Sequence, residues 1–213
     1  MAGKRKCPGL IIQNEVSKNK LTLKKTTRKA ESSAVTFLAI LHSLPVVVFF
    51  EDEARFGRIS REMACWVKAS MVPSVPRQMI RECIYAYSAL SPQTGDCYSM
   101  ISPCCNTEAM NEFLQQLSSH YNNYRIVLIL DKAGWHISHT LKIADNIKLL
   151  HLNPYSPEQN PVELLCRKIR RKYFHNVIFQ SLDEAENKLQ LALLNYHQQK
   201  EAVQKLAKEF LSI

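Results

Sequence analysis

The sequence predicts an α/β domain in which a mixed β-sheet is flanked by helices. Runs of β-branched and aromatic residues, typical of buried strands, dominate the first half of the chain. From Thr107 onward, apolar residues also recur at helical spacing. The chain has 213 residues, of which 46% are hydrophobic and 22% are charged. This length and composition suit one globular domain with a sizeable core and a short additional segment.

The first 45 residues are expected to form a basic arm that ends in a short helix. They contain nine Lys or Arg and two Glu, so nine minus two gives +7 of the chain's net charge of +9. Ser32 or Ser33 suits the N-cap of a helix that continues to Leu44 and is ended by Pro45. The residues before this helix are polar and weakly periodic, so we expect a loosely ordered arm. Its charge favours a polyanionic partner such as nucleic acid.

The chain is expected to be a cytoplasmic protein without a membrane segment. Its seven cysteines include no CxxC pair, which argues against a disulfide framework and favours a reducing compartment. Polar residues and Pro45 interrupt the apolar stretch 34–50, and no small-residue cleavage site follows it. This stretch is therefore read neither as a signal sequence nor as a membrane span.

Four strands are expected in the first half of the domain. Residues 46–50 form an apolar run typical of a buried central strand, after which the chain is expected to turn around Gly57. Gly95 marks a second turn. The three other strands are expected at residues 64–69, 80–90 and 97–101.

Helices and strands alternate in the second half. Thr107 fits the N-cap of an amphipathic helix that ends near His120. Asn160 suits the N-cap and Pro161 the first position of a later helix. The apolar face of the first of these helices comprises Met110, Phe113, Leu114 and Leu117. The other expected elements are strands at 125–130 and 147–152, helices at 138–144 and 160–174, and a last helix opened by Ser181.

Three acidic residues, Asp52, Asp131 and Glu163, each follow closely on a strand-like run. Each alone reads as a polar turn residue. If the strands are neighbours, however, the three carboxylates converge at one edge of the sheet, where their repulsion is relieved by a cation. Hard oxygen ligands suit Mg²⁺ or Mn²⁺, and pairs of such ions support phosphodiester chemistry. Glu51 and Glu53 are weaker candidates, because alternation along the strand places both on the face opposite to Asp52.

Antiparallel strands followed by alternating strands and helices are the element order of a ribonuclease-H-like domain. In that layout, acidic residues lie on the first strand, at the end of the fourth strand and on a late helix, which are the places of Asp52, Asp131 and Glu163. Three segments resemble the catalytic blocks of the mariner-related bacterial insertion-sequence transposases, which carry a DDE triad. These segments are VVVFFEDEARFGR, LILDKAGWHIS and LNPYSPEQNPVELLCRKIRRKYF, and the resemblance covers roughly residues 46–190.

The resemblance implies that residues 46–213 form the catalytic domain of a DNA transposase. Such a domain cleaves transposon ends and transfers the strands into target DNA with Mg²⁺ or Mn²⁺. Asp52 and Asp131 would ligate metal, and Glu163 would complete the triad. The implied partners are transposon-end DNA, target DNA and further copies of the chain, which would form a homo-oligomer when active and associate with the nucleoid in a bacterium.

Further residues are candidates beside this triad. His136, five positions after Asp131, would orient a carboxylate or contact a phosphate, and Trp135 reads as a packing residue. Arg55 and Arg58 follow the first acid closely enough to touch the DNA backbone. A basic cluster after Glu163 favours phosphate contact as well. This cluster comprises Arg167, Lys168, Arg170, Arg171 and Lys172. Pro154 and Pro157 are expected to stiffen the loop that precedes Glu163.

Some features depart from the family's pattern. Lys132 stands where Asn is usual, Asn153 where Pro is usual, and Cys166 where Trp is common. The first 45 residues are also too few for the two helix-turn-helix modules that such transposases carry. Three alternatives therefore stay open. These are an inactive remnant that only binds nucleic acid, a structure-specific nuclease on the same fold, and a nucleic-acid methyltransferase suggested by the segment NPY, although the glycines are all isolated.

Overall fold

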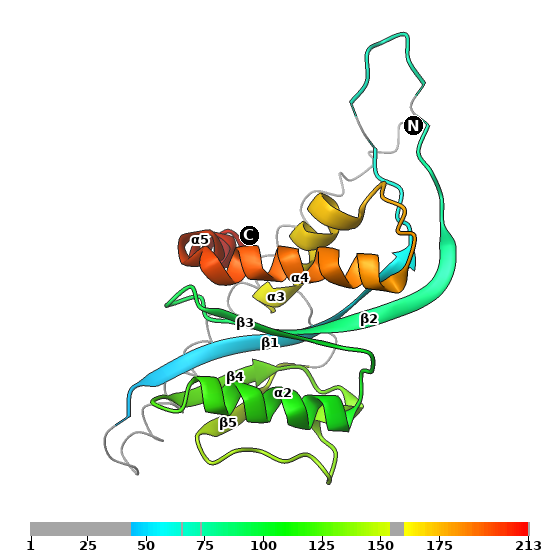
Figure 1. Cartoon of the computed structure of the whole chain (residues 1–213). Helices are drawn as coiled ribbons and strands as arrows, with labels where there is room; N and C mark the ends of the chain where they lie inside the picture. The colour runs from blue at the N-terminus through cyan, green and yellow to red at the C-terminus, as the bar shows by residue number, and fades with distance from the viewer. Residues whose placement is uncertain (1–43, 65, 73, 154–159, 213) are drawn as a thin grey trace, which may run out of the picture.

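The computed structural model describes residues 44–64, 66–72, 74–153 and 160–212. Its centre is a five-stranded sheet with helices on both faces (Figure 1). The strands are β1 (Val46–Ile59), β2 (Met79–Leu90), β3 (Cys97–Ser102), β4 (Arg125–Leu130) and β5 (Ile147–His151). They lie in the order β3-β2-β1-β4-β5, antiparallel from β3 to β1 and parallel from β1 to β5. This is the predicted mixed sheet.

The helices form one layer on each face of the sheet. On one face lies α2 (Thr107–His120), and its predicted apolar residues Met110, Phe113, Leu114 and Leu117 are all buried. The other layer comprises α3 (Pro161–Ile169), its π-helical continuation η3 (Arg170–Phe174), α4 (Leu182–Gln198) and α5 (Lys200–Ser212) (Figure 1). Among the residues described, no helix is both long enough and apolar enough to cross a membrane.

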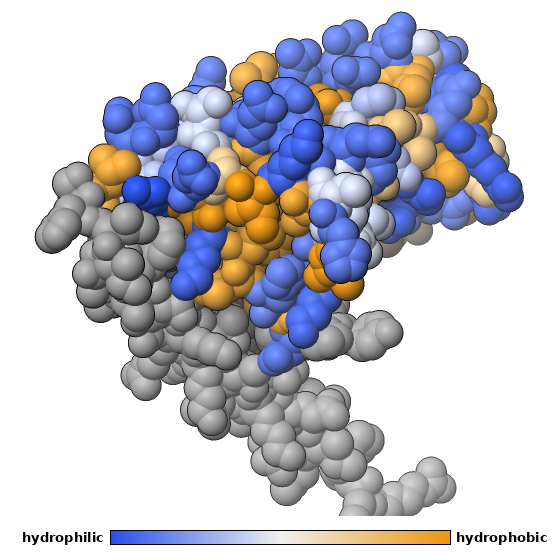
Figure 2. All heavy atoms as spheres, turned by 90° about the horizontal axis from the view of Figure 1, so that it is seen from below, coloured by the Kyte–Doolittle hydropathy of each residue, from blue (hydrophilic) through white to orange (hydrophobic). Residues whose placement is uncertain are grey.

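Alternate residues of β1 enter two separate cores. Val47 and Phe49 pack with α2, whereas Val48, Phe50, Ala54 and Phe56 pack with the helices of the other layer. Because side chains alternate along a strand, Glu51 and Glu53 belong to the α2 side and Asp52 to the α3 side, as expected. Seen from below, an apolar area lies in the middle of the described surface, with polar residues along part of its margin (Figure 2).

The first strand is longer than the sequence indicated. The predicted turn around Gly57 is wrong, because β1 continues through this residue to Ile59 and pairs with β2 along the way. Asp52 therefore lies within the strand. The strand predicted at 64–69 is also wrong: the described part of this segment is irregular, and Trp66 is fully exposed. It belongs to a long connection between β1 and β2 that projects from the sheet (Figure 1).

Two further differences concern helices. The helix predicted at 138–144 does not form, and a single 3₁₀ turn, η1 (Gly134–His136), precedes that segment instead. The helix opened by Ser181 is not the last, because α5 follows it. The predicted N-caps Asn160 and Ser181 are confirmed, whereas α2 is capped by Asn106, one residue before the expected Thr107. The expected arm and helix before Leu44, and the loop that holds Pro154 and Pro157, lie outside the described residues.

Candidate functional site

Two of the candidate acids meet at the carboxyl end of β4, where its parallel pairing with β1 ends. These strands are parallel, and Phe50 pairs with Ile129 at the end of their shared register. Continuing that register by two residues places Asp52 opposite Asp131, which directly follows β4. In parallel sheets this edge is where ligands bind. The pairing therefore explains why these two acids, 79 positions apart in the chain, belong to one site.

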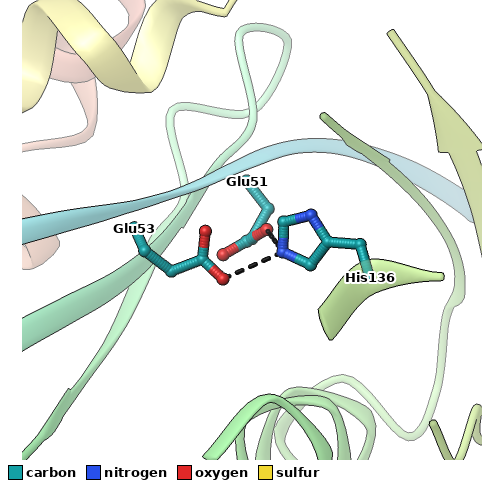
Figure 3. Close-up of side chains that lie close together, drawn as sticks. All are labelled: Glu51, Glu53 and His136. Atoms are coloured by element: carbon teal, nitrogen blue, oxygen red, sulfur yellow. Dashed lines mark hydrogen bonds and ion pairs between the residues drawn. The ribbon is translucent and has the colours of Figure 1, made fainter. Parts of the chain in front are cut away.

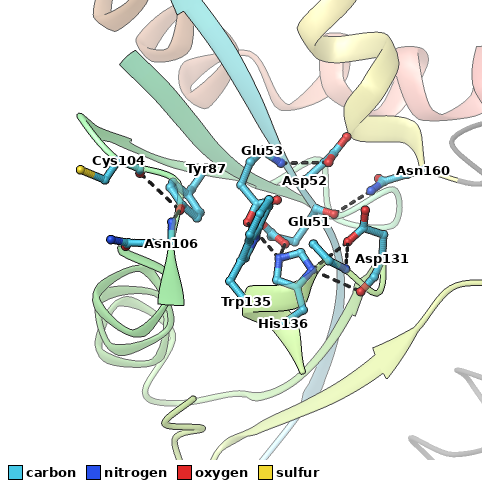
Figure 4. Close-up of polar contacts among 11 residues, drawn as sticks. Glu51, Asp52, Glu53, Tyr87, Cys104, Asn106, Asp131, Trp135, His136 and Asn160 are labelled. Carbon is cyan, nitrogen blue, oxygen red and sulfur yellow. Dashed lines mark hydrogen bonds and ion pairs between the residues drawn. The ribbon is translucent and has the colours of Figure 1, made fainter. Parts of the chain in front are cut away.

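The third acid is brought to the same edge by the N-cap of α3. Asn160 accepts a hydrogen bond from the Val162 amide at its side-chain oxygen (3.2 Å), and its amide nitrogen donates to the main-chain oxygen of Glu51 (2.6 Å; Figure 4). Asn160 is 3% exposed, so this link is shielded from water. It fastens the first turn of α3, which carries Glu163, to β1 directly beside Asp52.

The charges of these acids act on one another. Burial, followed by the charges of Glu53, Glu163 and Asp131, raises the pKa of Asp52 to about 7, although the hydrogen bond from the Glu53 amide opposes this rise. A carboxyl group that resists ionisation at neutral pH among other acids is typical of a cation site. The carboxylate oxygens of Asp52, Asp131 and Glu163 do not all lie within 4.8 Å of one another.

This elevated pKa predicts a pH-dependent stability. The Asp52 carboxyl releases its proton near pH 3.8 in the unfolded chain and near pH 7 in the folded protein. The free energy of unfolding therefore decreases as the pH rises through this window. In metal-free buffer with EDTA, we expect Asp52→Asn to remove this loss and to stabilise the protein at pH 8 by about 2 kcal/mol, after discounting for solvent screening. Urea unfolding at pH 4, 6 and 8 measures the free energy of unfolding of both proteins. The same dependence on pH in the variant and the wild type would contradict this expectation.

On the opposite face of β1, Glu51 and Glu53 meet His136 from η1 (Figure 3). Nε2 of His136 lies 2.9 Å from Oε1 of Glu53 and 3.7 Å from Oε2 of Glu51. The Trp135 indole donates a hydrogen bond of 2.7 Å to the same Glu53 oxygen. Glu51 is 0% exposed, and burial, followed by the charge of Glu53, raises its pKa well above the ordinary range.

His136 connects this cluster with Asp131. Its Nδ1 lies 2.8 Å from Oδ1 of Asp131, which also accepts a hydrogen bond of 2.8 Å from the Ala133 amide (Figure 4). Burial opposes the charged ring, yet the hydrogen bonds to Asp131 and Glu53 prevail and raise the pKa of His136 to about 10. The hydrogen bond from His136 in turn lowers the pKa of Asp131. The imidazole thus contacts the Asp131 carboxylate directly, and its expected role in orienting that carboxylate stays a prediction.

The candidate basic residues are in different environments. Arg58 is 13% exposed at its side chain and donates to Glu82 (2.7 Å) and to the main-chain oxygens of Phe179 (3.0 Å) and Gln180 (2.8 Å). Arg170 stacks on the Phe56 ring, 5.1 Å from its centroid. Arg55, Arg167, Arg171 and Lys172 are exposed, and Lys168 is half-buried.

The residues that depart from the expected pattern are accommodated by the fold. Lys132 is exposed, and within the described residues it forms no ion pair with Asp52, Asp131 or Glu163. Cys166 is 3% exposed within the core beneath α3, where burial raises the pKa of its thiol. Asn153 is exposed at the end of the described segment after β5.

Sequence reasoning missed the contacts that join Glu51, Glu53 and His136. Alternation along β1 indicated the face of the two glutamates, but no local signal indicated that the chain after β4 returns beneath them. The second role of Asn160, as a tether to β1, was missed for the same reason. Both contacts join residues more than 80 positions apart.

Comparison with known proteins identifies relatives of this chain. A family model described as DDE superfamily endonuclease matches residues 47–186. The uncharacterized protein y4pE/y4sA of Sinorhizobium fredii (strain NBRC 101917 / NGR234) is 41% identical over 101 residues, which are 47% of this chain and 75% of that protein.

Solved structures share the fold at low sequence identity. The Mos1 transposase paired-end complex with left transposon end matches with a TM-score of 0.58 and 14% identity, over 100% of this chain and 66% of that one. The Mos1 mariner paired end complex with Mn matches with a TM-score of 0.59 and 11% identity, over 100% and 65%. The predicted ribonuclease-H-like fold is thus confirmed. The chain spans slightly less than two thirds of the length of these transposase chains.

Proposed function

The chain belongs to the DDE superfamily endonucleases, and we propose that it is the catalytic domain of a DNA transposase, which cleaves transposon ends and transfers the strands into target DNA. Its main support is that Asp52 on β1, Asp131 at the end of β4 and Glu163 in the first turn of α3 are carried by neighbouring elements at one edge of the parallel strands. Both the family match and the likeness in fold to transposases solved with transposon-end DNA support it.

The proposed cofactor is Mg²⁺ or Mn²⁺, held by the carboxylates of Asp52, Asp131 and Glu163. These residues fit such an ion, because all three offer hard oxygen ligands and because burial, together with the charges of Glu53, Glu163 and Asp131, raises the pKa of Asp52. When bound, the metal would activate a water or a 3′-hydroxyl and stabilise the leaving oxygen of a phosphodiester. A transposase chain of the same fold has been solved with Mn.

The remaining residues of the site position these three groups. His136 holds the carboxylate of Asp131 at 2.8 Å, and Asn160 holds the helix that carries Glu163. The half-buried position of Asp52 keeps its carboxylate next to the protein interior, where charge interactions are strong. The chain thus supplies a preorganised set of acids, while DNA supplies the reacting phosphodiester.

DNA and further copies of the chain are the proposed partners. Exposed Arg167, Arg171 and Lys172 lie on or directly after α3, downstream of Glu163, and are the proposed contacts to phosphates. Arg55 is a further one, on β1 three residues after Asp52. The active form would be an oligomer that brings two transposon ends together, acting on DNA in the cytoplasm.

DNA cleavage by the purified chain tests this function. The substrate is duplex DNA with the sequences that flank the gene in its genome, labelled at one 5′ end, and a scrambled duplex of equal length serves as control. With Mg²⁺ or Mn²⁺ we expect nicks at the element's end and none in EDTA. DNA binding without cleavage at any metal concentration would instead support the inactive remnant.

The environments of the arginines predict different effects for two substitutions. Arg171→Gln should weaken DNA binding and reduce the slope of log K against log salt by about 1, with unchanged stability, because it removes one exposed charge. Arg58→Gln should lower stability by about 2 kcal/mol, because it leaves the oxygens of Glu82, Phe179 and Gln180 without their donor. Binding isotherms at three salt concentrations and urea unfolding distinguish them. A greater loss of stability for Arg171→Gln would contradict this assignment.

A further inference from the structure

Glu51, Glu53 and His136 have the arrangement of metal ligands (Figure 3). One ligand atom from each lies within 4.8 Å of the other two. The His136 Nε2 distances to Glu53 and Glu51 are 2.9 and 3.7 Å. In a tetrahedral zinc site with bonds of about 2.1 Å, neighbouring ligand atoms are about 3.4 Å apart. Small rotations of the two carboxylates would therefore let the three residues share one ion.

Glu51 is an independent indication that this cluster can bind a cation. Its side chain is 0% exposed and points at the imidazole, and neither of its carboxylate oxygens has a hydrogen-bond partner. A buried carboxyl group without a hydrogen-bond partner is unfavourable. His136 is shared among Glu51, Glu53 and Asp131, so one imidazole cannot satisfy all three carboxyl groups. A divalent cation would neutralise both glutamates.

The surrounding contacts are those that support ligands in metal sites. A ligating histidine usually donates its second N–H to a carboxylate, which fixes the ring and turns the lone pair of the other nitrogen to the metal. His136 has this geometry, with Nδ1 2.8 Å from Asp131 and Nε2 facing the glutamates. Glu53 is likewise oriented by Trp135 (2.7 Å).

We propose that Glu51, Glu53 and His136 bind one divalent transition-metal ion, Zn²⁺ in preference to Mg²⁺, at a second site across β1 from the triad. The imidazole favours Zn²⁺ over Mg²⁺, because Mg²⁺ prefers oxygen ligands whereas Zn²⁺ accepts nitrogen and oxygen ligands together. The ion would hold His136 in place and, through it, the Asp131 carboxylate. This proposed metal site does not require DNA cleavage, so it can be tested whether or not the chain is an active transposase.

Metal binding to the full-length chain with the triad disabled tests the proposal. The double substitution Asp52→Asn/Glu163→Gln removes two triad charges but keeps Asp131 for His136. After loading with ZnCl₂ and dialysis, we expect about one equivalent of zinc and a rise in Tm of about 5–10 °C, whereas MgCl₂ changes neither. Cobalt loading should produce the visible absorption bands of a nitrogen- and oxygen-ligated tetrahedral ion, a readout that requires no further variant.

Two added substitutions locate the ion. In the same background, Glu51→Gln and His136→Gln should each weaken zinc binding at least about 100-fold, since removal of a ligand exceeds the usual effect of a supporting contact. His139→Gln, at an exposed histidine of the same loop, is the matched control and should leave the affinity unchanged. Absence of retained zinc and of cobalt bands in the background protein would overturn the proposal. Equal zinc affinity in the Glu51→Gln, His136→Gln and control proteins would also overturn it.

Discussion

Asp131→Asn is expected to reduce metal-dependent DNA cleavage by about 10³-fold or more while the protein stays folded. The amide cannot supply the negative charge that binds a divalent ion. Its carbonyl oxygen can still accept the hydrogen bonds that Oδ1 of Asp131 now receives from the Ala133 amide and from His136. Steady-state cleavage of end-labelled duplex in Mn²⁺, with the Tm of each protein, measures both parts of this expectation.

Asp145→Asn is the matched control for this substitution. Asp145 is exposed and lies just before β5, at the edge of the parallel strands opposite to the candidate site. The same chemical change there should leave cleavage unaffected. Wild-type cleavage by the Asp131→Asn protein would remove Asp131 from the metal ligands, and equal losses in both variants would indicate a general effect of charge.

Gly57→Ala is expected to destabilise the protein by at least about 3 kcal/mol, or roughly 6–12 °C in Tm. A Cβ atom at this position would lie 2.1 Å from the main-chain oxygen of Glu82 and 2.8 Å from the Cα of Cys83. Both are backbone atoms of β2, so the clash is relieved only by separating the strands that pair around Gly57. Urea unfolding gives the free energy directly.

Gly134→Ala provides the comparison. A Cβ atom at Gly134 meets no atom within 4 Å, and its backbone does not require glycine. We therefore expect a change within about 0.5 kcal/mol. Equal stability of the two alanine variants would show that β1 and β2 do not approach as closely at Gly57 as the structure has them.

Where the sequence alone predicted the fold, the determinants were local. Residues 126–130 are all apolar and β4 has the predicted bounds 125–130, and Asn160 followed by Pro161 begins α3 as the cap and first-turn preferences require. The apolar spacing of α2 likewise predicted its buried face. Such patterns determine an element because every residue that decides it lies within a few positions.

The failures concern residues whose conformation depends on distant partners. Gly57 resembled a turn residue, but it lies in a strand because β2 passes too close for any side chain. Residues 64–69 have strand-like composition, yet the described ones find no partner strand. At the site, the placement of Asp52 and Asp131 at strand positions was foreseeable from the apolar runs. The return of His136 beneath β1 was not, because it is determined by the path of the chain after β4.

Manganese located by anomalous diffraction would test whether Asp52, Asp131 and Glu163 form one metal site. Crystals of the wild-type chain would be soaked in MnCl₂ and measured at a wavelength where manganese scatters anomalously. We expect a peak enclosed by the three carboxylates, with metal–oxygen distances of about 2.0–2.3 Å. Manganese bound elsewhere, for example only at Glu51, Glu53 and His136, with no peak among Asp52, Asp131 and Glu163, would contradict it.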